Sequence, residues 1–198
     1  VAAGVDAADF QRLLELATKA RDANIGFNVD AEEANRLDLS LDVIESVMRD
    51  PALQGWDGFG IVVQAYAKTC IPVLEWFAAL TTALDCRASV RLVKGAYWDM
   101  EIKQAQMLGL PGYPVYTRKA STDVSYLAGA RFLLAHDDRL YPQFATHNAH
   151  TVAAIIEMAS EHNRFEFQRL HGMGESLHEA VRVEDGAMIA AAEGVTDR

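Results

Sequence analysis

The sequence predicts an α/β protein, a (β/α)8 TIM-like barrel of which these 198 residues contain five recognisable strands. Apolar runs of strand length alternate with segments of helical periodicity. Some strand runs are apolar at consecutive positions, as in sheets covered on both faces, and polar residues follow several of the strands. An open doubly wound sheet would gather those polar residues at one switch point. We therefore expect a barrel, incomplete within this chain.

The first half of the chain is expected to form two strands and three helices. An apolar stripe at helical spacing contains Phe10, Leu13, Leu14, Ala17 and Ala20. Residues 61–63 are all β-branched and apolar, which favours a buried strand. The predicted order is a helix at 10–20, a strand at 24–30, a helix at 39–48, a strand at 58–66 and a helix at 70–84.

The second half continues the alternation without a linker, so a single domain is expected over 1–198. A Gly- and Pro-rich turn at 109–120 precedes a helix for which Ser121 or Thr122 is the expected N-cap, and His136 ends that helix. The predicted order is a strand at 88–97, a helix at 99–109, a helix at 121–136, a strand at 141–148, a helix around 152–159, a strand at 165–173 and a helix from Glu175.

Composition and charge exclude several functional classes. The net charge is −10, with 18 basic and 28 acidic residues, which argues against a nucleic-acid-binding surface. The two cysteines, Cys70 and Cys86, make no disulfide framework and suit a reducing, cytoplasmic setting. The most apolar window is 61–80. We expect no transmembrane helix there, because Gln64, Lys68 and Glu75 interrupt it.

Several polar residues at strand ends have structural interpretations. Asp30 and Asn148 could cap the helices that follow them, and Gln64 could satisfy nearby backbone groups. Three of the six histidines are assigned to surfaces or helix faces: His150, His162 and His178.

Arg91 and Lys94 are harder to explain structurally because they lie in an otherwise apolar strand. A guanidinium taken out of water needs a partner, so something anionic or electron-rich should contact Arg91. A Schiff-base aldolase would use Lys94, desolvated beside Arg91. A bound flavin or nucleotide would offer Arg91 an electron-rich edge, Gln64 a carbonyl and Lys94 a phosphate.

A metal-dependent hydrolase is the third candidate chemistry, with ligands Asp30, His147 and His171. The sequence lacks a His-x-His pair and any recognised zinc spacing. It also lacks the Gly-x-Gly-x-x-Gly fingerprint, which excludes a Rossmann-type nucleotide site. The residues by themselves leave all three chemistries open.

Six segments resemble the proline dehydrogenase domain of the bifunctional proline utilization A flavoproteins, in that family's order. They are "NVDAEEA", "VVQAY", "RLVKGAYWD", "GYPVYTRKASTDVSYLA", "PQFATHNAHT" and "FEFQRLHGMGE". The resemblance covers about 24–175 and leaves 176–198 unmatched. It implies a barrel that holds FAD at its C-terminal rim and oxidises L-proline to 1-pyrroline-5-carboxylate by hydride transfer to flavin N5.

The resemblance also implies roles by position. Arg91 would lie at flavin N5, with Asp30 as the active-site aspartate, and both are expected to be catalytic. The cofactor-binding residues would be Gln64, Arg91, Lys94, Gly95, Ala96, Trp98, Thr117, Thr146, His147 and Asn148. The substrate-binding residues would be Asp30, Tyr97 and Leu170, and no resident metal is expected.

The sequence departs from the family at both ends. The family binds the proline carboxylate with a first-strand lysine and an adjacent arginine pair on its last helix, and 176–198 contains no such pair. We expect the first strand and the last two to be absent or replaced, and the chain alone to have little activity. A flavin-binding or self-associating, non-catalytic fragment is the alternative function.

The resemblance also implies partners outside this chain. They are a quinone or other electron acceptor and the aldehyde dehydrogenase domain of the full-length protein. That bacterial, cytoplasmic protein is expected to associate peripherally with the inner membrane. A homo-oligomer could form through the open edges of the sheet.

Overall fold

The computed structural model of the chain describes residues 6–184 and 188–192. Its centre is a parallel sheet that contains β1 (Phe27–Val29), β2 (Phe59–Gln64), β3 (Ala88–Val93), β4 (Leu140–Ala145), β5 (Glu166–Leu170) and β6 (Met188–Ala192). The helices are α1 (Ala7–Asp22), α2 (Leu37–Met48), α3 (Cys70–Ala83), α4 (Trp98–Met107), α5 (Lys119–Ala135), α6 (Ala149–Met158) and α7 (Glu175–Glu184). Two short 3-10 helices, η1 (Ala34–Arg36) and η2 (Pro51–Leu53), flank α2.

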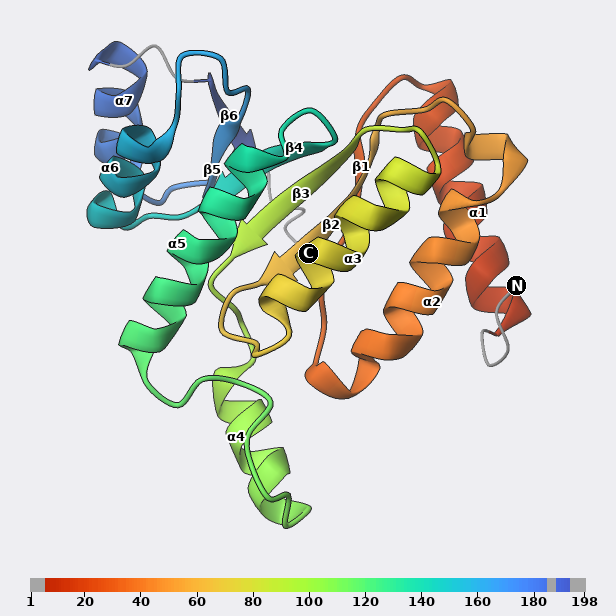
Figure 1. The fold of residues 1–198 in the computed structure, drawn as a ribbon, viewed down its shortest axis with the longest axis horizontal. Helices are drawn as coiled ribbons and strands as arrows, with labels where there is room; N and C mark the ends of the chain where they lie inside the picture. The colour runs from red at the N-terminus through yellow and green to blue at the C-terminus, as the bar shows by residue number, and fades with distance from the viewer. Residues whose placement is uncertain (1–5, 185–187, 193–198) are drawn as a thin grey trace.

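The strand order of the sheet is β1-β2-β3-β4-β5-β6, so each strand pairs with its neighbours in the sequence. A doubly wound sheet reverses its order at a switch point, whereas a barrel is wound in one direction. The sequential order therefore confirms an incomplete barrel of the TIM type (Figure 1).

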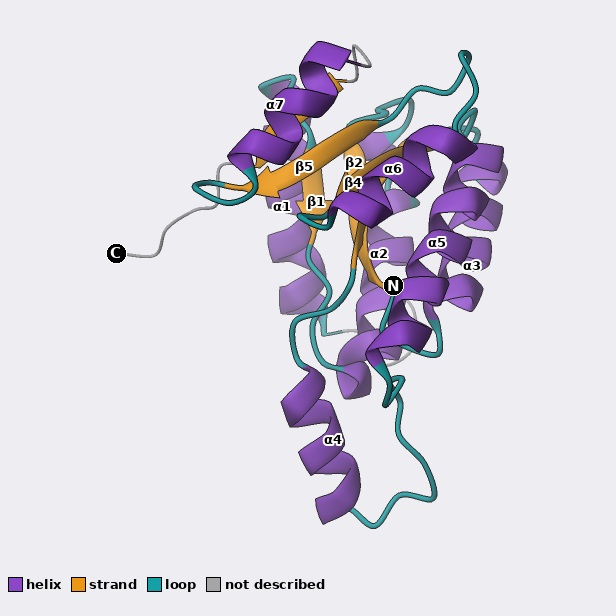
Figure 2. Cartoon of the chain, turned by 90° about the vertical axis from the view of Figure 1, so that its left-hand side faces the viewer, coloured by secondary structure: helices purple, strands orange, loops and turns teal. Residues whose placement is uncertain are grey.

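The outer face of the sheet is apolar and covered by helices. In β3, Ala88, Val90 and Leu92 are fully buried, while the alternate residues are half-buried on the opposite face. Helices α2, α3, α5 and α6 lie along the outer side (Figure 2), and their core includes Phe77 and Leu133. No helix within the described residues is long and apolar enough to cross a membrane.

Helix α4 has a different position from the other helices. It begins shortly after β3 and extends away from the sheet in both views (Figures 1 and 2). The following loop returns to the sheet, where Val115 is fully buried and forms an isolated antiparallel bridge with Ala67. The Gly- and Pro-rich segment is therefore an ordered connection that borders the carboxyl end of β2.

The structure differs from the sequence expectations at three places. A sixth strand, β6, occupies residues that we expected to contain no barrel element. Helix α5 begins at Lys119, so Ser121 and Thr122 lie in its first turn and do not cap it. His178, which we assigned to a surface or helix face, is only 2% exposed. The sequence of β6, "MIAAA", favours a helix by propensity, but its pairing with β5 overrides that preference.

Candidate functional site

The inner face of the half-barrel is polar, and Arg91 is its main cation. Neighbouring residues of parallel strands share a face, and the register places Val62, Arg91, Gln143 and Glu166 in one row. Nε of Arg91 donates to Oε1 of Gln168 at 2.6 Å, and Nη1 donates to Oδ1 of Asp30 at 3.3 Å. The expectation that Arg91 has an anionic partner is met within the protein.

Asp30 does not cap a helix, contrary to one of its two interpretations. Helix η1 begins four residues later, and Oε1 of Glu101 accepts the Ala34 amide at 2.6 Å. The Asp30 side chain is 75% exposed and the Arg91 side chain 27% exposed. The pair therefore lies at the mouth of the inner face, where a ligand could reach both residues.

Lys94 is held by a carboxylate on the outer helix layer. Its Nζ lies 2.5 Å from Oδ1 of Asp123, and Lys119 binds the second oxygen at 2.9 Å. These two ammonium groups lower the pKa of Asp123 through hydrogen bonds and charge, mostly through the bond to Lys94. Lys94 also lies 5.9 Å from the ring centroid of Tyr126. A Schiff-base lysine needs a free Nζ, and here Nζ is held in an ion pair with Asp123, which opposes the Schiff-base chemistry.

The turn after β3 is packed tightly against β2. Oε1 of Gln64 accepts the Ala96 amide at 3.2 Å, and Nε2 of Gln64 donates to the Glu32 carbonyl at 2.9 Å. The structural interpretation of Gln64 is therefore confirmed. Gly95 has φ +135°, and a Cβ there would lie 2.4 Å from Cγ of Tyr66. Burial raises the pKa of Tyr66 to about 12.

The residues that follow this turn approach the site from α4 and its loop. The Tyr97 hydroxyl donates to Oε2 of Glu32 at 2.9 Å, and this bond raises the pKa of Tyr97. The Trp98 indole N–H donates to the Tyr116 carbonyl at 2.9 Å, although the side chain stays partly exposed. Thr117 is exposed. Trp98, at the start of α4, and Thr117, in the loop between α4 and α5, therefore lie where that loop returns to the end of β3.

The end of β4 is organised by the turn 146–148. Asn148 caps α6, because its Oδ1 accepts the Thr151 amide at 2.9 Å. Nε2 of His147 accepts the Leu170 amide at 3.1 Å, so the neutral ring carries its proton on Nδ1. Thr146 is buried, and its carbonyl accepts from Nε2 of His178 at 3.0 Å.

The metal interpretation finds no support in this geometry. No group of three His, Cys, Asp or Glu side chains in the described part of the chain could hold a metal ion. Asp30 contacts Arg91, and His147 accepts a backbone amide. His171 is exposed, in the turn that follows β5.

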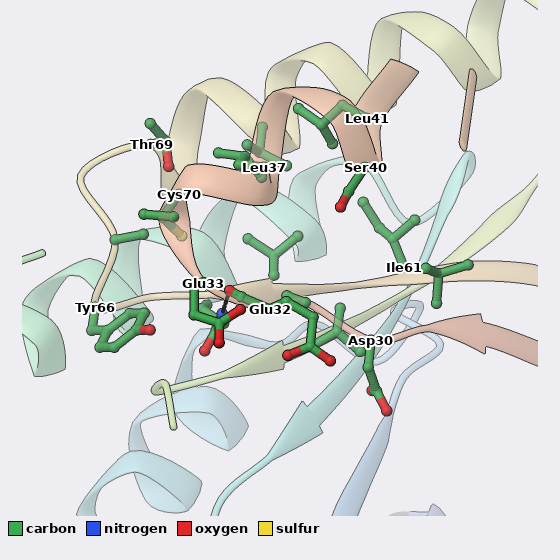
Figure 3. A pocket seen from close by; sticks show the side chains of 18 of the residues that line it. Asp30, Glu32, Glu33, Leu37, Ser40, Leu41, Ile61, Tyr66, Thr69 and Cys70 are labelled. Carbon is green, nitrogen blue, oxygen red and sulfur yellow. Dashed lines mark hydrogen bonds between the residues drawn. The ribbon is translucent and has the colours of Figure 1, made fainter. Parts of the chain in front are cut away.

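A cavity of about 60 Å³ lies between β2, α2 and α3 (Figure 3). Its lining is mostly apolar and includes Leu37, Leu41, Ile61 and Val73. Figure 3 shows the carboxylates of Asp30 and Glu32 on the other side of the β2 ribbon from Leu37 and Leu41. The lining also includes Asp30, Glu32 and Gln64, so the cavity extends from the outer core to residues of the candidate site.

Sequence reasoning missed the partners of the candidate residues. Gln168, Asp123 and Glu32 hold Arg91, Lys94 and Tyr97 respectively, across separations of 77, 29 and 65 residues. Local patterns carry no signal for contacts at this distance. The one signal in the sequence is that two cations in an apolar strand, Arg91 and Lys94, each need a polar partner.

Comparisons with known proteins agree on one family. A family model described as proline dehydrogenase matches residues 2–193. The bifunctional protein PutA of Klebsiella aerogenes is 55% identical over 184 residues, which are 90% of this chain and 14% of that protein. A crystal structure of Bradyrhizobium japonicum proline utilization A covers 92% of this chain and 19% of its own, with a TM-score of 0.90 at 54% identity.

A more distant structure has the same fold. Proline utilization A from Bdellovibrio bacteriovorus, inactivated by N-propargylglycine, has a TM-score of 0.87 at 32% identity, over 92% of this chain and 19% of that one. A half-barrel with charged side chains at its strand ends is the site type of α/β-barrel enzymes. Within that class, the chain belongs to the proline dehydrogenase family. It spans about 14% of the length of the PutA relatives it matches.

Proposed function

We propose that the inner-face site binds FAD and oxidises L-proline to 1-pyrroline-5-carboxylate as part of a longer protein. One observation carries the proposal. Arg91, in a chain of the proline dehydrogenase family, is fixed by two protein partners at the carboxyl end of the sheet yet remains partly exposed. A fixed cation at this position favours a group that gains negative charge in the reaction.

The donor set suits a flavin. A reduced flavin is anionic, and Arg91 and the Nδ1–H of His147 are donors that could bind such a charge. The Trp98 ring is fixed through its N–H and 42% exposed, so its face is open to a planar group.

The protein residues would bind and orient the reactants. FAD would supply the acceptor for the hydride that leaves proline. Arg91 and Asp30 would border the reacting end of the flavin, and Gly95 and Ala96 would let the backbone approach the cofactor. The substrate side would be formed by Tyr97, held by Glu32, and by Leu170, whose apolar side chain is 50% exposed.

The rest of the reaction belongs to the longer protein. Binding the proline carboxylate needs fixed cations. Lys94 is already paired with Asp123, and Arg91 would face the cofactor. We propose that the missing cations, a quinone or other electron acceptor and an aldehyde dehydrogenase domain lie outside these residues. A cytoplasmic protein that meets the inner membrane peripherally would fit this arrangement.

A chimera tests the proposal. This chain would replace the matching segment of Klebsiella aerogenes PutA, and proline-dependent dye reduction would be compared with that of the parent and of the isolated chain. We expect activity in the chimera within about tenfold of the parent, and little or none in the isolated chain. An inactive chimera that folds and retains FAD, or a fully active isolated chain, would contradict the assignment of this site.

A further inference from the structure

The side chain of Gln168 is the most buried of the polar groups that contact Arg91. It lies on β5, two strands away from Arg91 on β3, and it is 5% exposed. The residue of β4 that pairs with Gln168 is Ala145. A methyl side chain at that position leaves space for the two long side chains to meet. Their contact, Nε to Oε1, is 2.6 Å long.

Each end of the Gln168 side-chain amide contacts a group that can act only as a hydrogen-bond donor or only as an acceptor. Arg91 can only donate, so it must face the amide oxygen. The amide nitrogen donates to Oε1 of Glu166 at 2.6 Å, and a carboxylate can only accept. The two neighbours therefore determine the same orientation of the amide, independently of any choice between its oxygen and nitrogen.

Asp30 is a weaker constraint on the same guanidinium. Its contact with Nη1 is 3.3 Å long, and its side chain is 75% exposed, so water competes for both groups. The Gln168 contact is shorter and shielded from water, where a hydrogen bond to a charged group is stronger. Gln168 should therefore fix the plane of the guanidinium.

We propose that Gln168 is the positioning residue for Arg91, and that Glu166 sets the direction in which the Gln168 amide points. The contacts with Gln168 and Asp30 use Nε and Nη1. With the guanidinium plane fixed, the other N–H bonds of Arg91 also have a defined direction. The consequence for a cofactor rests on the proposed function, whereas the orientation of Arg91 itself does not.

Two variants separate the parts of this chain of hydrogen bonds. Gln168→Leu keeps a side chain of similar size and removes the acceptor for Arg91. Tyr141→Phe is the matched control, because it removes only a 3.4 Å contact from the Tyr141 hydroxyl to the other oxygen of Glu166. Circular dichroism and thermal unfolding report whether each variant is folded.

The measurement is the solvent exchange of the Arg91 Nε–H proton, observed by ¹⁵N NMR and assigned by its loss in Arg91→Lys. In the parent chain we expect slower exchange than for Arg12, whose side chain is 79% exposed. Gln168→Leu should speed the exchange at least about tenfold, as expected for losing a hydrogen bond to a charged group. Tyr141→Phe should change it less than about threefold.

Glu166→Gln provides a second route if Gln168→Leu does not fold. A neutral amide at position 166 can donate as well as accept, so the Gln168 amide becomes free to turn its nitrogen toward Arg91. We expect faster exchange than in the parent and slower exchange than at Arg12. A parent signal that exchanges as fast as that of Arg12 would overturn the inference, as would one unchanged in folded Gln168→Leu or Glu166→Gln.

A second readout connects the inference to the cofactor. In FAD-loaded protein, Gln168→Leu should lower the midpoint potential of the flavin, because a misaligned Arg91 stabilises the anionic reduced form less. Tyr141→Phe should leave it unchanged. Protected Arg91 in a chain that binds no FAD would support the inference and contradict the proposed function. Bound FAD beside an unprotected Arg91 would do the reverse.

Discussion

The ring of His178 on α7 donates from Nε2 to the carbonyl oxygen of Thr146 at the end of β4, over 3.0 Å. Its Nδ1 is buried and, among the described residues, has no hydrogen-bond partner. Burial is the main cause that lowers the pKa of His178 below 6.5, and the nearby His147 and Arg169 lower it further. Helix α7 is therefore attached to the sheet by a neutral histidine.

This contact predicts a loss of stability in acid. Because the folded protein resists protonation of His178, the unfolded chain binds more protons below about pH 6.5, and the contribution is lost as the pH falls through that range. Between about pH 7.5 and pH 5.5, the melting temperature of His178→Gln should fall about 2–4 °C less than that of the parent. The exposed His162→Gln should behave as the parent does. Equal slopes for all three proteins would contradict the prediction.

Gly95→Ala should destabilise the chain through its backbone and through Tyr66. Alanine is strained at φ +135°, and its Cβ would lie 2.4 Å from Cγ of the Tyr66 ring. Gly109→Ala is the matched control, with φ +61° and no atom within 4 Å of the added Cβ. In urea unfolding, Gly95→Ala should lose about 1–3 kcal/mol more than the control. Equal losses of unfolding free energy in the two variants would show that the Tyr66 ring can move away without destabilising the chain.

Substitutions of Asn148 separate its role as a helix cap from a role in cofactor binding. Asn148→Ala should lower the free energy of unfolding by about 1 kcal/mol, because the Thr151 amide loses its acceptor. Asn148→Asp keeps the cap, so its stability should stay within about 0.5 kcal/mol of the parent. The new charge should nevertheless weaken binding of an anionic cofactor. Unchanged FAD affinity in Asn148→Asp would limit Asn148 to the cap.

Arg91→Met should separate flavin reduction from flavin binding. The substitution keeps most of the side-chain bulk and removes the charge that we propose faces the cofactor. In the PutA chimera, stopped-flow reduction by proline should slow on the order of 100-fold, while FAD affinity changes far less. Equal reduction rates in Arg91→Met and the unsubstituted chimera would make Arg91 a structural residue.

The sequence was sufficient for features that depend on local pattern. Continuous apolar residues identified β2, and the Asn148 cap follows from residue type at a strand-helix junction. Alternation of strand and helix predicted the α/β class, and polar residues after several strands favoured the barrel. It failed for β6, where alanine-rich residues adopt a strand because β5 offers a pairing edge. Burial of His178 likewise depends on the turn that folds α7 back onto β4.

The candidate site was only half visible in the sequence. The pattern showed that Arg91 needs a partner, and the resemblance assigned the flavin to that place. Gln168 lies on β5 and Asp30 at the end of β1. They contact Arg91 only because the strands assemble into one sheet. Such long-range pairs follow from strand order and register, neither of which a local motif encodes.

Titration of the flavin-free 198-residue chain with FAD, followed by flavin fluorescence, tests the central claim most directly. A site for an isoalloxazine ring at Arg91 predicts saturable binding with one FAD per chain, and weaker binding in Asn148→Asp. Gly109→Ala should bind as the parent does. A folded chain whose flavin signal never saturates would contradict the claim that these strand ends form a flavin site.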